Sequence, residues 1–304
     1  MEGDKLMADN GKNIVALMTL YYPDTQVLEN IKLISKQVSS ILLIDNTPNN
    51  DNFDSSSISN AKYFPNHENL GLSTAFNKCL LEKEAVESDY VIFFDQDSKI
   101  EEKHIETLVS DFEGLSMSYK VGYLGPSFLE TNTGEIHGVM PYSKEAENNC
   151  WTVPATITSS IITKYEILKE VGFWNEKVFL DYADLDLGWR LTKAGFTNFV
   201  TKNVLMVHKL GNRTKDVHIP FRKRPSKVVI HKPYRLYYQV RDGLRLIFKP
   251  YVPKSGKRTI CTELILRLYV HLAYLDDKYE SLKCWFKGFF DGVRGVCGPI
   301  RTDL

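Results

Sequence analysis

Short apolar runs alternate with amphipathic stretches along the first two thirds of this 304-residue chain. The runs are rich in β-branched and aromatic residues and avoid polar residues on both faces, which is typical of strands buried in a parallel sheet. Strands are predicted over residues 13–20, 40–44, 62–65, 90–94, 121–126 and 196–207, and helices over 25–37, 72–83, 103–115, 164–171 and 179–194. The alternation predicts an α/β fold with a mainly parallel central sheet flanked by helices.

The pattern changes in two places. Residues 127–150 are polar and contain glycine, which favours an excursion with a hairpin. After Leu210 the chain becomes basic and aromatic, with helices predicted over 234–248 and 262–293. We therefore expect a disordered N-terminus (1–12), an α/β domain (13–210) and a basic, aromatic, helical C-terminal region (211–304).

Charge is balanced over the whole chain, with 38 basic and 38 acidic residues, but it is unevenly distributed. Between Lys209 and Arg258, fifteen Lys or Arg residues stand against only Asp216 and Asp242, a local net charge of +13. Such an excess indicates an anionic partner, such as a pyrophosphate, an anionic membrane face or a nucleic acid, or else a solvated basic face.

Several protein classes are disfavoured by what the sequence lacks. The five cysteines are scattered without a CxxC pair, which argues against a disulfide framework or a zinc ribbon and favours reduced thiols in the cytosol. The N-terminus lacks the apolar stretch of a secretory signal. The sequence also contains no run of eighteen apolar residues, so no transmembrane helix is predicted. Neither a GxGxxG nor a Walker loop is present, which argues against dinucleotide enzymes and P-loop ATPases.

The most informative stretch is YVIFFDQDSKI, where a buried strand runs into Asp95-Gln96-Asp97. Ligands of open α/β sheets bind at the carboxyl ends of the strands. Two carboxylates there suit a hard divalent cation that shares its coordination with substrate phosphates. A lone DxD is more often an acidic turn that ends a strand. Other motifs in the chain are therefore needed to distinguish a cation site from such a turn.

Two further stretches belong to the same predicted edge. Asp45-Asn46 follows the second strand, where a carboxylate could accept the N3–H of a uracil or thymine ring, although turn chemistry also explains the pair. In NHENLGLSTAFN, Gly71 precedes a helix, so the chain could approach a ligand closely and the helix N-terminus could face an anion. The alternative is an ordinary loop that enters a helix.

Carboxylates also cluster in FLDYADLDLGWR, at the predicted start of a helix, where the helix dipole stabilises them. The cluster consists of Asp181, Asp184 and Asp186. Their neighbours are apolar, a setting that raises a carboxylate pKa toward that of a useful general base. Downstream, VLMVHKLG places His208 at a strand end, where it could act as a nitrogen ligand beside the DQD or be purely structural.

Taken in order, these motifs resemble a family 2 glycosyltransferase with the GT-A fold, and most of all the bacterial rhamnosyltransferases that build O-antigens, capsules and cell-wall polysaccharides. The resemblance covers about the first 210 residues and rests on LYYPD, LLIDN, NHENLGLSTAFN, FFDQD, FLDYADLDLGWRLTKAGF and VLMVHKLG. The segment HKPYRLYYQVRDGL is similar to the stretch that follows the catalytic domain in that family.

The resemblance implies a role for each matching nucleotide-site residue. Tyr21 and Asp45 would hold the nucleobase, Asn69 and Gly71 would flank the nucleotide, and Asp95 would face the ribose or the metal. Leu20 replaces the usual Thr of the family, so one base contact is in doubt.

The same resemblance implies the metal ligands and the base. Asp97 and His208, with Asp95, would ligate a divalent cation (Mn²⁺ or Mg²⁺) that bridges the pyrophosphate. Asp184 falls at the position of the catalytic base, and Asp181 is the alternative because the acidic residue that usually precedes the base is Ala183 here.

The implied reaction is inverting, because one base without a nucleophile on the opposite side means a single displacement. The expected donor is dTDP-β-L-rhamnose and the expected acceptor a lipid-linked glycan in surface polysaccharide synthesis. The alternatives are a UDP-sugar donor (galactofuranose, glucose or N-acetylglucosamine) or a non-catalytic glycan-binding subunit. A sugar nucleotidyltransferase is disfavoured, because its Gly-rich N-terminal signature is absent.

The last predicted helix carries an apolar stripe at helical spacing, made of Leu282, Trp285, Phe286, Phe289, Phe290 and Val293. With the basic segment ahead of it, the stripe suits an interfacial helix on the anionic inner face of the cell membrane. It could equally pack on its own domain or on another subunit, so an oligomer is possible. We expect a cytoplasmic protein without a nucleic-acid partner, with peripheral contact to the inner face of the cell membrane as one option.

Overall fold

A computed structural model describes residues 11–49, 53–140, 143–209, 211, 213–219 and 225–300. Disorder is predicted for residues 1–12, and residues 1–10 of that segment lie outside these ranges. The strands are β1 (Ile14–Leu20), β2 (Ser40–Asp45), β3 (Ala61–Pro65), β4 (Tyr90–Asp95), β5 (Val121–Glu130), β6 (Glu135–His137), β7 (Cys150–Val153), β8 (Ile162–Thr163), β9 (Thr197–His208), β10 (Arg213–Val217) and β11 (Ser226–Ile230). The helices are α1 (Thr25–Ser35), α2 (Leu72–Leu80), α3 (Lys83–Val86), α4 (His104–Ser116), α5 (Tyr165–Glu170), α6 (Ala183–Lys193), α7 (Pro233–Ile247), α8 (Lys254–Tyr274) and α9 (Lys278–Arg294).

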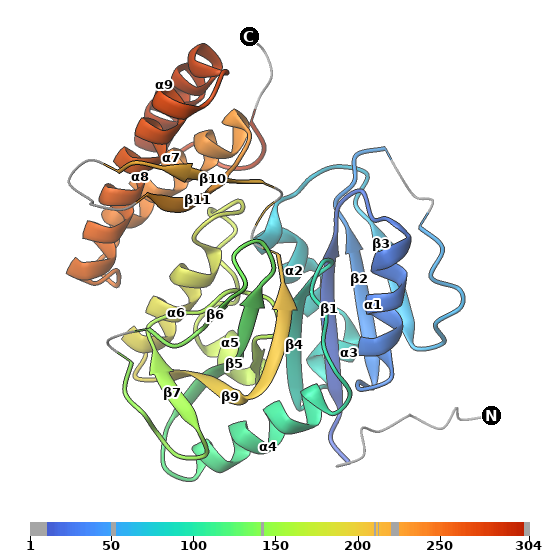
Figure 1. The fold of residues 1–304 in the computed structure, drawn as a ribbon. Helices are drawn as coiled ribbons and strands as arrows, with labels where there is room; N and C mark the ends of the chain where they lie inside the picture. The colour runs from blue at the N-terminus through green and yellow to red at the C-terminus, as the bar shows by residue number, and fades with distance from the viewer. Residues whose placement is uncertain are drawn as a thin grey trace.

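One twisted sheet forms the centre of the molecule, with strand order β3-β2-β1-β4-β8-β5-β9-β7 (Figure 1). β1 pairs in parallel with β2 and β4, β2 with β3, and β5 with β9, whereas β8 and β7 run antiparallel to their neighbours. β6 folds back on β5, which confirms the hairpin predicted in the polar excursion. The predicted α/β class with a mainly parallel sheet is confirmed.

Alternate residues of the central strands face opposite layers of helices. Val15 and Leu17 pack in a cluster with residues of α2 and α6, while Ala16 and Met18 pack with residues of α1 and α4. Because both faces are covered, these strands have no polar face, and this is why they appear in the sequence as continuous apolar runs. The polar residues are therefore confined to the strand ends, where a site can form.

Two helix predictions need correction. The helix predicted over 179–194 begins only at Ala183, because Tyr182 adopts a left-handed backbone with φ of +70°. Residues 179–182 therefore form a loop that leads into α6. The single helix predicted over 262–293 is two helices, α8 and α9, separated at 275–277, where two consecutive aspartates favour a break over a helix interior.

The helices after residue 232 pack together beside the sheet, and the antiparallel hairpin β10–β11, which was not predicted, lies next to them (Figure 1). α9 approaches α7 closely through glycines: a Cβ on Gly288 would lie 2.6 Å from the Tyr237 carbonyl oxygen. Of the helices in the described ranges, none has the length and apolar character that crossing a bilayer requires.

Candidate active site

The carboxyl ends of β1, β2 and β4 lie at one edge of the sheet. In the parallel register, Leu20 is opposite Asp45 and Thr19 is opposite Asp95, so both aspartates end their strands at the same level. β9 ends at His208, and the backbone N–H of Lys99 donates to the carbonyl of Val207 over 2.9 Å, which brings the end of β9 against the turn after β4. The fold thus brings together residues that are more than a hundred positions apart.

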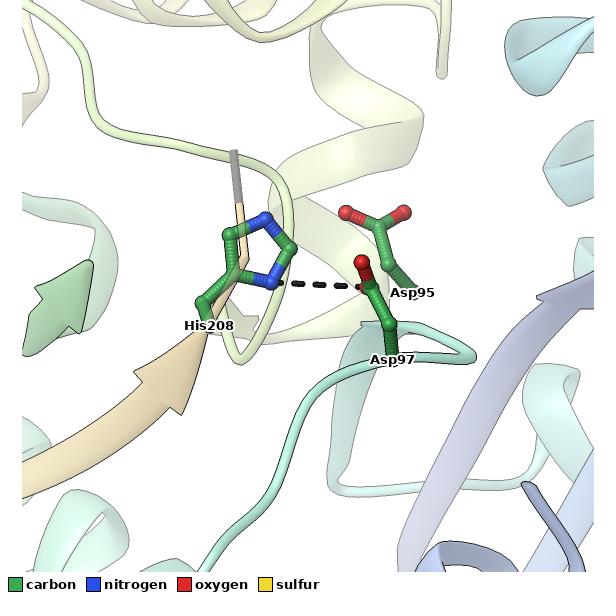
Figure 2. A group of neighbouring side chains, drawn as sticks. All are labelled: Asp95, Asp97 and His208. Atoms are coloured by element: carbon green, nitrogen blue, oxygen red, sulfur yellow. Dashed lines mark ion pairs between the residues drawn. The ribbon is translucent and has the colours of Figure 1, made fainter. Parts of the chain in front are cut away.

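Asp95, Asp97 and His208 form a compact group at this edge. One ligand atom from each residue lies within 4.8 Å of the other two, and the His208 Nδ1 is 3.5 Å from a carboxylate oxygen of Asp97 (Figure 2). Opposite ligands of an octahedral cation are about 4.2 Å apart, so small side-chain rotations suffice to hold one ion. Two carboxylates and an imidazole are donors that a divalent cation accepts.

The electrostatics of Asp95 also favour a cation. Burial raises the pKa of Asp95 to about 6, and the field of Asp97 adds to the rise, while His208 and Arg235 oppose it. A positive ion beside these carboxylates would offset the cost of holding them together. Behind the group, the Ser98 hydroxyl lies 3.0 Å from the His208 Nδ1 and 2.5 Å from the Ser159 hydroxyl, which fixes the orientation of the ring.

Gln96, the middle residue of the DQD, fastens the turn to the end of β1. Its side-chain oxygen accepts from the Tyr21 N–H over 2.7 Å, and its side-chain N–H donates to the Tyr21 carbonyl over 3.1 Å. The Asn30 amide of α1 donates to the Gln96 carbonyl over 2.9 Å. Sequence reasoning missed this residue, and only its place between two candidate ligands could have drawn attention to it.

Tyr21 and Asn69, both expected near the nucleotide, lie side by side. The Tyr21 side chain is 45% exposed. Partial burial and the neighbouring Tyr22 raise the pKa of the Tyr21 phenol, and a hydrogen bond with Asn69 partly offsets the rise. The Asn69 carboxamide oxygen accepts from the Gly71 N–H over 3.0 Å, a short loop contact that fixes the chain before α2.

Asp45 is placed differently from the other expected nucleotide residues, because its side chain is fully buried. The Thr47 N–H donates to one carboxylate oxygen and the Tyr63 hydroxyl to the other, each over 2.8 Å. A base N–H would have to share or displace one of these donors to reach the carboxylate. Its role in holding a base stays a prediction.

Gly71 allows a close approach, as expected, but the segment it approaches belongs to the protein. Its φ is +78°, and a Cβ would lie 2.4 Å from the Phe179 carbonyl oxygen. That oxygen accepts from the Leu72 N–H over 2.7 Å, and the Asn46 amide donates to the Gly71 carbonyl over 3.1 Å. The glycine therefore ties the start of α2 to the loop before α6.

The pKa values of the two candidate bases, Asp184 and Asp181, are shifted in opposite directions. Burial raises the pKa of Asp184, in the first turn of α6, to about 6, and the Leu185 N–H that donates to it over 2.8 Å lowers it only in part. Burial also pushes the pKa of Asp181 upward, but the guanidinium of Arg235, which contacts both carboxylate oxygens over 3.1–3.2 Å, outweighs it and leaves that pKa below its usual range. Asp184 is thus the better proton acceptor near neutral pH.

Asp186, the third carboxylate of the cluster, holds the fold together. Its fully buried side chain accepts from the Arg190 Nε over 2.7 Å, from the Asn175 amide over 3.0 Å and from the Tyr251 hydroxyl over 2.6 Å. These contacts join α6 to the segment before it and to the connection between α7 and α8. A carboxylate with that many donors does not serve as a base.

The sequence relationship agrees with this geometry. Residues 26–172 match the family model described as Glycosyl transferase family 2. The chain is also 26% identical over 311 residues to the dTDP-rhamnosyl transferase RfbF of Shigella flexneri, a match that covers 96% of this chain and 99% of the relative. Residues 26–172 form a family 2 glycosyltransferase domain.

Solved structures give this glycosyltransferase the same fold. Residues 1–349 of S. aureus TarS in complex with UDP-GlcNAc superpose with a TM-score of 0.54 at 14% identity, covering 93% of this chain and 81% of that chain. GalNAc-T7 with UDP, GalNAc and Mn²⁺ superposes with a TM-score of 0.54 at 11% identity; the match covers 87% of this chain but only 58% of that longer chain. The expected GT-A fold and the expected family are confirmed.

Proposed function

We propose that this glycosyltransferase transfers L-rhamnose from dTDP-β-L-rhamnose to an acceptor hydroxyl, with inversion at the sugar and with Asp184 as the base. The observation that carries the proposal is the contrast between Asp184 and Asp181. Asp184 has a raised pKa and lies close enough to the Asp95 carboxylate to feel its charge. The similarity to a protein described as a dTDP-rhamnosyl transferase, over almost the full length of both chains, supports the donor.

The chain's own residues supply the proton transfer. Asp184, ionised above about pH 6, accepts the proton of the acceptor hydroxyl as that oxygen attacks the anomeric carbon. Asp181 is held by Arg235 and so is not available as a nucleophile on a second face. A single displacement follows, and it would convert the β-linked donor into an α-L-rhamnoside.

We assign Asp95, Asp97 and His208 to a divalent cation, either Mn²⁺ or Mg²⁺. The three donors match what such ions accept, and the Mn²⁺ present in the GalNAc-T7 complex supports a cation in this fold. Bound there, the ion would neutralise charge on the leaving nucleotide diphosphate. Tyr21, Asn69 and the segment around Gly71 would flank the nucleotide, and the nucleobase would lie near Asp45.

For the acceptor we propose a lipid-linked glycan of a bacterial surface polysaccharide, reached at the inner face of the cell membrane. The buried residues of α9 are all small: Ser281, Cys284, Gly288 and Gly292. The outer face exposes Phe286, Phe290 and Val293 by 52%, 53% and 68%. Lys283, Lys287 and Arg294 lie on the same helix. An aromatic face with basic neighbours suits anionic lipid.

The membrane contact has a direct test in flotation with vesicles of anionic and of zwitterionic lipid. The double variant Phe286→Ser, Phe290→Ser is expected to lose binding to anionic vesicles, whereas Phe248→Ser, at a still more exposed phenylalanine outside α9, keeps it. Unchanged binding of the double variant would exclude this face. A change in oligomeric state instead would assign it to a second subunit.

The function itself is tested by thermal shift and donor turnover with a panel of nucleotide sugars, in Mn²⁺, Mg²⁺ and EDTA. We expect dTDP-rhamnose to bind and turn over, and EDTA to abolish turnover. Preference for a UDP-sugar would overturn the donor but keep the site. Binding of glycan without turnover of any donor would favour a non-catalytic glycan-binding subunit.

A further inference from the structure

α7 turns one face toward the loop that leads to Asp184. Residues 235, 238 and 242 recur at helical spacing on that face. Arg235 pairs with both carboxylate oxygens of Asp181. The Tyr238 ring stacks on Phe179 with centroids 4.3 Å apart and planes 10° apart, and the Asp242 carboxylate accepts from the Phe179 N–H over 2.8 Å. Three side chains of one helix thus hold one four-residue loop.

The loop needs such support because its backbone is strained. Tyr182 has φ of +70°, a conformation that aromatic residues rarely adopt. Strain of this kind persists only where the surroundings hold it. Here the Tyr182 ring is buried against α7, where a Cβ on Gly243 would lie 3.2 Å from its edge. Asp184 follows Tyr182 by two residues.

α7 is in turn fixed by the end of the chain. The fully buried Arg241 pairs with Asp242 over 2.7 Å and donates to the Gly298 carbonyl over 2.5 Å. The Ile300 N–H donates to the Tyr238 hydroxyl over 2.8 Å. The two residues that hold Phe179 are therefore held themselves by residues 298–300.

We propose that α7 is part of the active site, with Arg235 and Asp242 as positioning residues that set the place of Asp184 through the loop 179–182. The inference rests on the proposed function only in taking Asp184 as the base. It also implies that the expected division near residue 210 does not separate a catalytic unit from an accessory one, because the base loop is completed by residues on the far side of that division.

The test is a double-mutant cycle on the loop's ion pair, with kcat and donor KM measured separately. Arg235→Gln and Asp181→Asn are each expected to lower kcat roughly ten- to a hundred-fold, because a small misplacement of a catalytic group has effects of that size. Donor KM should stay within about two-fold. The double variant should be no slower than the worse single variant, because both substitutions break one contact. Arg235→Lys should recover part of the rate.

Arg245→Gln is the matched control, because Arg245 lies on the same helix and binds the carbonyls of Lys177 and Val296 rather than the loop. It is expected to keep kcat within about two-fold. An equal loss in Arg245→Gln, or losses in the cycle that multiply, would overturn a specific role for Arg235. So would a kcat that Arg235→Gln leaves unchanged.

Hydrogen exchange separates this inference from the proposed function. In the free protein, the amides of residues 179–184 should exchange faster in Arg235→Gln than in wild type, while those of β1 and β4 stay protected. Unchanged exchange of the loop would overturn the inference even if the enzyme is a rhamnosyltransferase. Faster exchange in a protein that turns over no donor would overturn the proposed function alone.

Discussion

Asp184 is half-buried at the start of α6, and the loss of water around its carboxyl raises its pKa from about 3.9 to about 6. A base works only when ionised, so kcat/KM should follow the ionised fraction in the free enzyme. With a pKa of about 6, that fraction falls from nearly complete at pH 8 to about one tenth at pH 5. We expect an acidic limb with a midpoint near pH 6, moved to lower pH where a bound cation stabilises the carboxylate.

Replacement of Asp184 by Asn would remove the proposed base while keeping the shape of the side chain. Loss of a general base costs typically about 10²- to 10⁴-fold in rate, so kcat should fall by that amount and the acidic limb should disappear. Asp186→Asn is not a suitable control because it breaks the contacts with Arg190 and Tyr251. Asp89→Asn, at an aspartate on the opposite end of β4, provides one.

The raised pKa of Asp184 also predicts how stability depends on pH. Stability should fall as the pH rises, whereas the expected activity increases. Because the folded pKa lies above the unfolded one, the folded protein binds the proton more tightly, and stability is lost as the pH rises through the interval from about 4 to about 6. The rise in pKa corresponds to about 3 kcal/mol at pH 8. In EDTA, Asp184→Asn should therefore melt at a higher temperature than wild type at pH 8 and at a similar temperature at pH 4.

Initial rates from pH 5 to 9 and melting curves at the two pH values complete the measurement. An Asn variant that transfers sugar within three-fold of the wild type would refute Asp184 as the base. An acidic limb that persists in that variant would assign the titration to another group. Equal melting temperatures at pH 8 would show that the carboxyl is not desolvated as its position indicates.

Three further predictions concern residues at the same edge of the sheet. Asp97→Asn should abolish stimulation by Mn²⁺ or Mg²⁺ and the metal-dependent thermal shift, whereas Asp54→Asn on the surface should change neither; stimulation that survives would exclude Asp97 as a ligand. Gln96→Leu removes two hydrogen bonds to Tyr21 and should raise donor KM about five-fold with less effect on kcat; a kcat effect alone would contradict a role in holding the nucleotide side. Gly71→Ala should destabilise the protein by at least about 1 kcal/mol in denaturant unfolding; unchanged stability would mean that the loop before α6 moves aside freely.

Much of the fold was predictable because burial on both faces leaves a simple signal. β1, β2 and β4 are continuous apolar runs, and their parallel order determines that Asp45 and Asp95 end at one edge. The convergence of Asp95, Asp97 and His208 could be inferred for the same reason. The helix start at Ala183 could not be inferred, because the left-handed backbone of Tyr182 depends on packing against α7.

Residues whose role depends on distant backbone were the hardest to recognise. Gln96 contacts Tyr21, 75 positions earlier, and Gly71 meets the carbonyl of Phe179, 108 positions later. No local pattern encodes such contacts. Gly71 was noticed because glycine before a helix permits a close approach, but the sequence did not say that the approaching group was the loop before α6.

The carboxylates of FLDYADLDLGWR show why the family resemblance could favour Asp184 as the catalytic base but had to keep Asp181 as the alternative. Asp181, Asp184 and Asp186 are chemically identical and lie within six positions of one another. Their partners differ: Asp181 receives Arg235 from α7, and Asp186 receives Arg190 and Tyr251. In the part of the chain that the structure describes, Asp184 has no cation paired with it, although it is removed from water. A carboxylate in that condition gains most from taking a proton, so the placement of the neighbouring cations is what favours Asp184 as the proposed base.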